Sequence, residues 1–288
     1  MMVEALVYFF VPALVGVLIG IASGLLGIGG GTVMVPIFRL AFGMSATMST
    51  ATSLFAIIPT SISGAISHVK GKTCIPALGI AAGLGGACLS PVGVWLAQLS
   101  PDWLVMLAAA LIIGYSAINM FKKAFKLRPA GQPATGVDAP AAASLTSSGE
   151  PAVSAPTADD SSLSRKQLLQ GAAIGLVAGL SSGYVGVGGG FIMVPLMLSI
   201  IGIPMRKASG TSLIAVMILA IPGVIEQGII GNINYLAGIA IVVGTIPGAV
   251  IGARLVTKVP ERTLRLLFGC FLIVAAVMLV LNEVGIFG

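Results

Sequence analysis

Two glycine-rich runs are the stretches of this chain whose residue types and spacing best suit ligand chemistry. The sequence GLLGIGGGTVMVPI begins at Gly24, and GYVGVGGGFIMVPL begins at Gly183, 159 positions later. Glycine-rich loops can present backbone N–H groups to phosphate in nucleotide-binding proteins. That chemistry requires either a strand before a dinucleotide loop or a Gly-Lys-Ser/Thr ending. Here a long apolar stretch precedes the first run and no lysine follows either run, so neither nucleotide motif is present.

The composition of the chain places both runs in a membrane. Of its 288 residues, 57% are hydrophobic and only 8% are charged, whereas soluble domains carry about 25% charged residues. Several apolar stretches approach the roughly 20 residues that a membrane-spanning helix needs. We therefore predict an all-α, polytopic helical membrane protein.

The same composition argues against two other classes of function. Lysines and arginines cluster at the ends of apolar segments and form no basic face of the kind that binds nucleic acid, so no such partner is expected. One histidine, three separated cysteines and very few carboxylates within the apolar segments provide no convergent catalytic set. We expect neither an enzyme nor a metal or cofactor site.

The chain is an internal duplication joined by a polar linker. A shift of 159 residues aligns the two runs without a gap, and nine of the 14 positions are identical between 23–36 and 182–195. Residues 127–164 are rich in Pro, Ala, Ser and Thr, and such a segment buries too little apolar surface to become ordered. The expected organisation is a first transmembrane repeat at 1–126, a disordered cytoplasmic linker at 127–164 and a second repeat at 165–288.

Each half contains five apolar segments, the second of which is too short to cross a bilayer as a helix. A helix over 32–42 would cover about half of a 30 Å hydrocarbon core. Five passes per half would turn the second copy upside down and leave every Lys and Arg except Arg39 on the side of the linker, as the positive-inside rule prefers. We therefore predict two inverted repeats, each with one short broken helix, and both termini outside. The segments of the first half are 5–25, 32–42, 47–67, 75–99 and 103–121.

Each glycine run is predicted to break a helix inside the membrane. Glycine destabilises a helix interior by about 1 kcal/mol relative to alanine, and a broken backbone is tolerated in a membrane only beside protein or a water-filled cavity. A helix that begins after the break offers unpaired N–H groups and a positive dipole end, which suit an anion. Close helix packing is the alternative explanation of the glycines. The substrate-binding residues expected here are Gly29, Gly30, Gly31, Thr32, Gly188, Gly189, Gly190 and Phe191.

A few polar side chains are further candidates. Arg39 has no basic counterpart in the second half; it could neutralise an anion within the membrane or extend to the interface. His68, the only histidine, is expected to be a loop residue beside Lys70. Hydroxyls that recur in both halves could donate hydrogen bonds to an oxoanion, or could bond to the preceding helical turn. These hydroxyl residues are Thr52, Ser53, Thr211 and Ser212.

The duplicated motifs resemble a known family. GIGGGTVMVPIF and GVGGGFIMVPLM, each followed by TSL, are similar to the sulfite exporter TauE/SafE family, and PGAVIGARL at Pro247–Leu255 also fits it. GNINY at Gly231–Tyr235 fits as well, whereas GKTCIP at Gly71–Pro76 departs from the GN-I/V-N/D pattern expected at that place. Members of this family are prokaryotic inner-membrane permeases associated with sulfite, sulfonates and other organosulfur anions.

The resemblance implies a function that agrees with the helix-break argument. We expect a secondary transporter, acting as an exporter, that moves a small sulfur-containing anion by alternating access. An uptake permease or an anion channel for related anions is the alternative. The expected partners are the anion and the lipid bilayer, while a coupling ion such as a proton and a homo-oligomer stay open.

Overall fold

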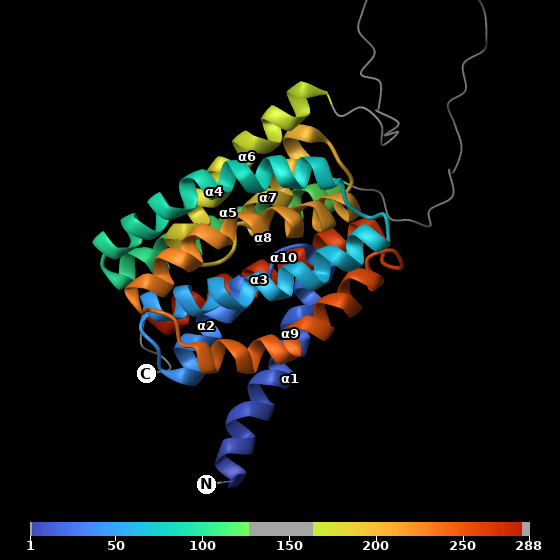
Figure 1. Ribbon diagram of the computed structural model, residues 1–288. Coiled ribbons are helices and arrows are strands. Elements are labelled where there is room, and N and C mark those ends of the chain that lie inside the picture. Colours follow the sequence, from blue (N-terminus) through green and yellow to red (C-terminus); the bar gives the residue numbers. More distant parts are fainter. Residues whose placement is uncertain (1, 127–163, 284–288) are drawn as a thin grey trace, which may run out of the picture.

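Every regular element in the described residues, 2–126 and 164–283 of the computed structural model, is a helix (Figure 1). Within these ranges, seven helices are long and apolar enough to cross a membrane: α3, α4, α5, α6, α8, α9 and α10. The predicted all-α, polytopic membrane fold is therefore confirmed. The first half comprises α1 (Met2–Leu26), α2 (Gly31–Phe42), α3 (Ala46–Lys70), α4 (Pro76–Leu99) and α5 (Asp102–Lys126). The second comprises α6 (Arg165–Val185), α7 (Gly190–Leu196), the π-helix η1 (Met197–Ile201), α8 (Met205–Ile230), α9 (Tyr235–Leu255) and α10 (Glu261–Glu283).

The helices of the two halves correspond under the same shift of 159 residues. The shift carries α2 onto 190–201, which is the combined span of α7 and η1. Hydrogen bonds correspond too. The amide of Ala46 donates to Asp102 Oδ2 at 3.3 Å, and the equivalent amide of Met205 donates to Glu261 Oε1 at the same distance. In both halves, a carboxylate that begins one helix thus caps the start of another.

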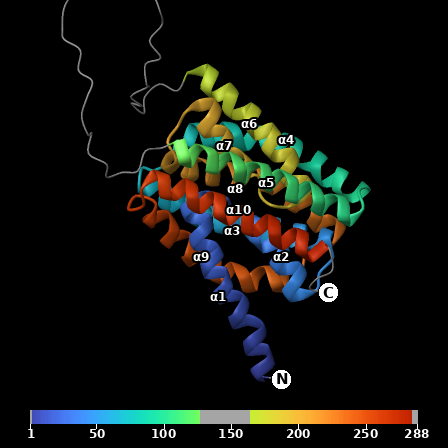
Figure 2. The same ribbon diagram turned by 180° about the vertical axis from the view of Figure 1, so that it is seen from behind.

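Helices are exchanged between the two halves in the packed structure. The helix α4 of the first half lies against α6 and α8 of the second, and α9 of the second half lies against α1 and α3 of the first. The two groups meet where α3 packs against α8, and the α5–α10 pair lies behind them in Figure 1 and in front of them in Figure 2. The units that pack together are therefore not the units that repeat in the sequence.

Small residues bring the exchanged helices into backbone contact. A β-carbon built on Gly175 of α6 would overlap the carbonyl oxygen of Ala82 in α4. In the equivalent pair, a β-carbon on Gly16 of α1 would lie 2.5 Å from the carbonyl oxygen of Ile241 in α9. Such close approach is the packing that small residues allow in membranes. Many of the glycines are therefore explained by helix packing alone, which was the alternative weighed for the glycine-rich runs.

The contacts also give the relative directions of the central helices. Gly64, late in α3, lies beside Leu213, early in α8, and Leu54, early in α3, lies beside Gly223, late in α8. These equivalent helices are therefore antiparallel. By the same reasoning α1 and α9 are parallel, because glycines further along α1 contact residues further along α9.

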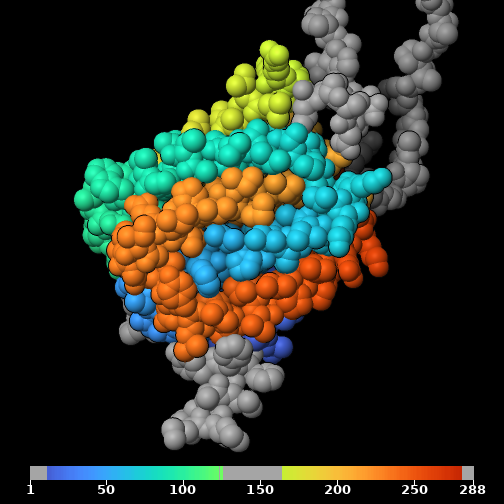
Figure 3. All heavy atoms as spheres, viewed as in Figure 1, coloured from blue at the N-terminus to red at the C-terminus, as the bar shows by residue number. Residues whose placement is uncertain are grey.

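The outer surface of the helices is apolar. Figure 3 shows α4, α8, α3 and α9 side by side across one face, in the order that their contacts give. Large side chains such as Leu84, Ile221, Ile66 and Ile239 are exposed on these four helices. A surface of this kind suits lipid. The linker predicted for 127–164 lies outside the described residues except for Ser164, whose side chain caps α6.

Candidate functional site

The two glycine-rich breaks meet in the interior of the protein. A β-carbon built on Gly31, the first residue of α2, would lie 2.5 Å from the carbonyl oxygen of Val187 in the second break. A β-carbon built on Gly190, the first residue of α7, would lie 2.5 Å from the carbonyl oxygen of Gly27 in the first break. The helices α2 and α7 thus begin one residue before the predicted starts, and their first residues lie against the opposite break.

Two apolar side chains show the depth at which the breaks meet. Ile57, near the middle of α3, and Val216, near the middle of α8, each lie beside both Gly29 and Gly188. All four residues are buried. The breaks therefore meet at the mid-length of two helices that are long enough to span a membrane.

The backbone at each break requires glycine. Gly29 and Gly30 have φ values of 81° and 85°, and Gly188 and Gly189 have values of 87° and 68°. This left-handed region strains residues that carry a β-carbon. The consecutive glycines are therefore needed for the shape of the breaks and not only for close helix packing.

The first break leaves its amides without hydrogen bonds. Within the described residues, the N–H groups of Gly29, Gly30, Gly31 and Thr32 donate to no acceptor, and the N-cap Gly30 has no side chain to help. In the second break the amide of Gly190 instead donates to Gly188 O at 2.8 Å. Unpaired amides at the start of the 12-residue α2 form an electropositive site that could bind an anion.

The hydroxyls expected to bind substrate have different environments. Thr52 Oγ1 accepts from the amide of Asn234 at 3.0 Å, and Thr211 Oγ1 accepts from the amide of Ile75 at 2.9 Å. The Ser212 hydroxyl donates to Gly27 O at 2.7 Å, which ties α8 to the first break. These bonds give the three residues a structural role, and their role in binding stays a prediction.

Other hydroxyls close to the breaks are also buried without a hydrogen-bond partner: Ser23 and its counterpart Ser182, Ser61, and Thr32 in the first turn of α2. Ser23 and Ser61 were not identified from the sequence, and Thr32 was. A β-carbon on Gly29 would lie 3.4 Å from Ser61 Oγ, and one on Gly30 would lie 3.6 Å from Ser23 Cβ. Ser53, the fourth of the recurring hydroxyls, is also buried and unpartnered. Unpaired buried hydroxyls are uncommon, because each costs about 1–3 kcal/mol.

Comparison with known proteins is decisive for the family. The family model described as sulfite exporter TauE/SafE matches residues 12–279. The chain belongs to the TauE/SafE family. It is 27% identical over 288 residues to "Probable membrane transporter protein YunE" of Bacillus subtilis, and the alignment covers 97% of this chain and 99% of that protein. No solved structure matches the chain.

Two further relatives support the same conclusion about this TauE/SafE protein. "Probable membrane transporter protein YdhB" of Bacillus subtilis is 27% identical over 253 residues, covering 88% of this chain and 92% of that protein. A "Probable membrane transporter protein" of Haemophilus influenzae is 28% identical over 289 residues, covering 93% and 97%. The family and these names indicate a multi-pass membrane transporter.

Two polar residues of this TauE/SafE protein lie away from the place where the breaks meet. Arg39 is in the last turn of α2, eight residues or about 12 Å along the helix from Gly31. The expectation that His68 is a loop residue was wrong, because it lies in α3 and is fully buried. Its Nε2 donates to Gly24 O at 2.8 Å, and its Nδ1 lies 2.7 Å from Thr73 Oγ1. The imidazole therefore links α1 to the α3–α4 loop, a contact between distant segments that sequence position alone did not reveal.

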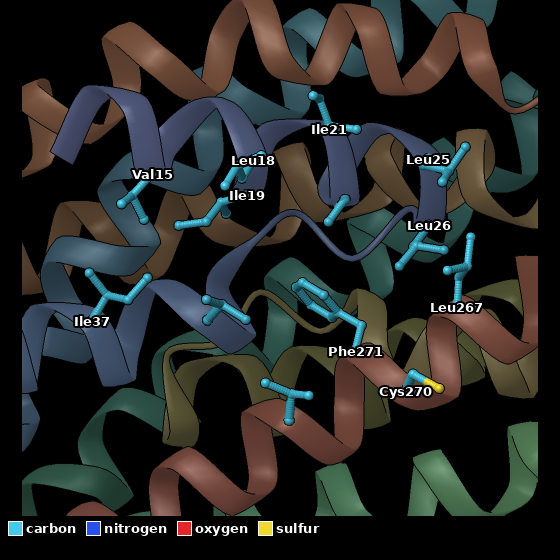
Figure 4. Close-up of a pocket in the computed structure, with 13 residues that line it drawn as sticks. Val15, Leu18, Ile19, Ile21, Leu25, Leu26, Ile37, Leu267, Cys270 and Phe271 are labelled. Atoms are coloured by element: carbon cyan, nitrogen blue, oxygen red, sulfur yellow. The ribbon is translucent and has the colours of Figure 1, made fainter. Parts of the chain in front are cut away.

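An apolar pocket of about 560 Å³ lies between α1, α2 and α10. Figure 4 shows Ile19, Ile37 and Phe271 among the side chains that line it, and Cys270 contributes a sulfur atom. Such a lining offers an anion no strong hydrogen-bond donor. The amides and hydroxyls at the breaks therefore suit an anion better than this pocket does.

Proposed function

We propose that this protein is a secondary transporter that exports a small sulfur-containing oxoanion, such as sulfite or a sulfonate, across the inner membrane. The observation that carries the proposal is the meeting of two glycine breaks at the mid-length of α3 and α8. Discontinuous helices at corresponding places in two repeats are typical of transporter substrate sites. Amides at a helix start can bind an anion without a neighbouring cation. The description of the family supports both the substrate class and the direction.

We further propose that the two halves are inverted repeats that operate by alternating access. The antiparallel arrangement of the equivalent helices α3 and α8 supports this topology. The distribution of charge supports it too, because a cytoplasmic linker would leave only Arg39 among the Lys and Arg residues away from the cytoplasmic side. A reporter fused to the C-terminus should then be active outside the cytoplasm. A cytoplasmic signal would contradict the topology.

Flux measurements in proteoliposomes test the function. The purified protein should carry sulfite, a sulfonate or thiosulfate with saturable kinetics, and the rate should depend on an ion gradient. Comparing flux with and without a proton gradient would identify proton coupling. Flux that does not saturate and is independent of any gradient would instead favour the anion channel, and absence of flux for every sulfur anion would contradict transport.

Substitutions at the breaks test the place of the site. Gly30→Leu and Gly189→Leu should abolish flux, because both glycines have left-handed backbones and neighbours that leave no room for a larger side chain. Gly114→Leu is the matched control, since a β-carbon there would meet nothing within 4 Å. Membrane abundance and elution as a single species in detergent would be measured for all three variants. Full transport by both break variants would indicate that these glycines serve helix packing and not substrate binding.

A further inference from the structure

The two breaks have unequal polar surroundings, although their glycines are equivalent. Ser61, beside the first break, has Ala220 as its counterpart in the second half. Thr32, in the first turn of α2, has the apolar Phe191 as its counterpart in α7. The second half therefore lacks two of the hydroxyl groups that the first half carries at this depth.

The hydroxyl of Ser61 is directed at the first break. It lies 3.4 Å from the position that a β-carbon would take on Gly29, it is fully buried, and no described group bonds to it. Ser23 is likewise buried and unpartnered, as is its counterpart Ser182. The side chain of Ser23 flanks Gly30 from α1, whereas the neighbours of the equivalent Gly189 are atoms of Ala178. Two donors from different helices thus flank adjacent glycines whose amides are themselves unpaired.

The backbone also differs between the two breaks, and the first break again has the more unpaired donors. The amide of Gly31 donates to no described acceptor, whereas the equivalent amide of Gly190 is bonded to Gly188 O. The helix that follows the first break is α2, with 12 residues, whereas α7 has seven before the π-helix. Backbone and side chains therefore both favour the first break as the place of negative charge.

We propose that the oxoanion head group binds at the first break alone, held by the amides of Gly29–Gly31 and the hydroxyls of Ser23 and Ser61. This inference rests on the proposed function, since it assigns the anion to one of the two breaks. The site takes a compact oxoanion with several acceptor oxygens, because the amides and hydroxyls proposed to hold it are all hydrogen-bond donors. Apolar side chains, Ile57 and Val216 among them, limit its size beside Gly29. The second break supports the first sterically through the contact between Gly31 and Val187 O.

Binding by the purified full-length protein in detergent tests this assignment. Sodium sulfite would be titrated against thermal unfolding, with sodium chloride at equal ionic strength as the reference. Ser61→Ala should raise the sulfite concentration for half-maximal stabilisation by about tenfold, and Ser23→Ala/Ser61→Ala should abolish stabilisation. Ser90→Ala is the matched control. Ser90 is a buried, unpartnered serine that lies beside Gly223 rather than at the break, and its loss should change sulfite binding less than twofold.

The unfolding temperature without anion separates binding from folding. Ser61→Ala and Ser90→Ala should both unfold at or above the wild-type temperature, because each removes an unpaired buried hydroxyl. An equal loss of sulfite binding in both variants, or unchanged binding in Ser61→Ala, would overturn the assignment. Saturable sulfite flux with an unchanged KM in Ser61→Ala would overturn it too, while leaving the transport function intact. Sulfite binding that depends on Ser61 without any flux would support the site and contradict the proposed transport.

Discussion

Replacement of His68 tests whether the link between α1 and the α3–α4 loop stabilises the fold. The buried imidazole donates to Gly24 O in the last turns of α1, and its other nitrogen bonds to Thr73 Oγ1. The equivalent residue of the second half, Gln227, is also buried, and its Oε1 accepts from Asn232 Nδ2 at 2.8 Å. Glutamine is therefore accommodated at the equivalent buried position and bonds there to the counterpart of Thr73, which makes His68→Gln the natural control for His68→Leu.

The expected effect follows from the groups left without partners. In His68→Leu, the carbonyl of Gly24 would lose its donor at a buried position, which costs about 1–3 kcal/mol. The hydroxyl of Thr73 would lose one bond but keep the backbone carbonyl of residue 68 at 3.3 Å, so its loss is about 1 kcal/mol. We expect His68→Leu to lower the free energy of unfolding by about 2–4 kcal/mol, and His68→Gln by about 1 kcal/mol or less.

Unfolding in mixed micelles with increasing fraction of denaturing detergent, followed by circular dichroism, would measure these differences. The variants should rank wild type, His68→Gln and His68→Leu in order of decreasing midpoint. Gln227→Leu should cost less than His68→Leu, about 1 kcal/mol, because the side chain of Gln227 bonds to Asn232, the counterpart of Thr73, but not to the counterpart of Gly24. A leucine variant as stable as wild type, or a glutamine variant as unstable as leucine, would refute the hydrogen-bond explanation.

Two further predictions concern helix contacts. Gly175→Ala should destabilise the protein by about 1–3 kcal/mol, because the added β-carbon would overlap Ala82 O. Gly114→Ala is the control and should be neutral or stabilising, since nothing lies within 4 Å of its β-carbon. Equal unfolding midpoints for the two variants would contradict the packing explanation. Thr60 and Thr245, whose hydroxyl oxygens lie 2.6 Å apart between α3 and α9, should show a coupling of about 0.6 kcal/mol in a double-mutant cycle of valine substitutions, and strictly additive effects would argue against that bond.

The sequence was sufficient to predict the helices and the breaks, because both depend on local features. Apolar segments of membrane length predicted the spans, and the expected short segment 32–42 is found as α2, Gly31–Phe42. Three consecutive glycines are incompatible with an undisturbed helix, whatever surrounds them. The internal duplication then placed a second break at the same relative position.

The polar contacts could not be predicted, because they depend on which helices become neighbours. Thr52 and Ser53 are adjacent in sequence, yet Thr52 accepts from the amide of Asn234 while Ser53 has no partner. Ser61 matches an alanine in the second half, so the duplication directed attention away from it. The exchange of α4 and α9 between the halves could not be predicted from the apolar pattern, because that pattern predicts which segments are helices and not which helices become neighbours.

The exchange of α4 and α9 has a consequence for biogenesis. During synthesis of the first half, α4 enters the bilayer before its main neighbours α6 and α8 exist. Until those helices are inserted, the small residues of α4 that contact α6 have no helix to pack against, and the same holds for the small residues of α1 that contact α9. Neither half can therefore mature alone, although two separately expressed halves could complete each other. Under the proposed inverted topology, an ancestor with half this length would have needed two interlocked copies inserted in opposite orientations.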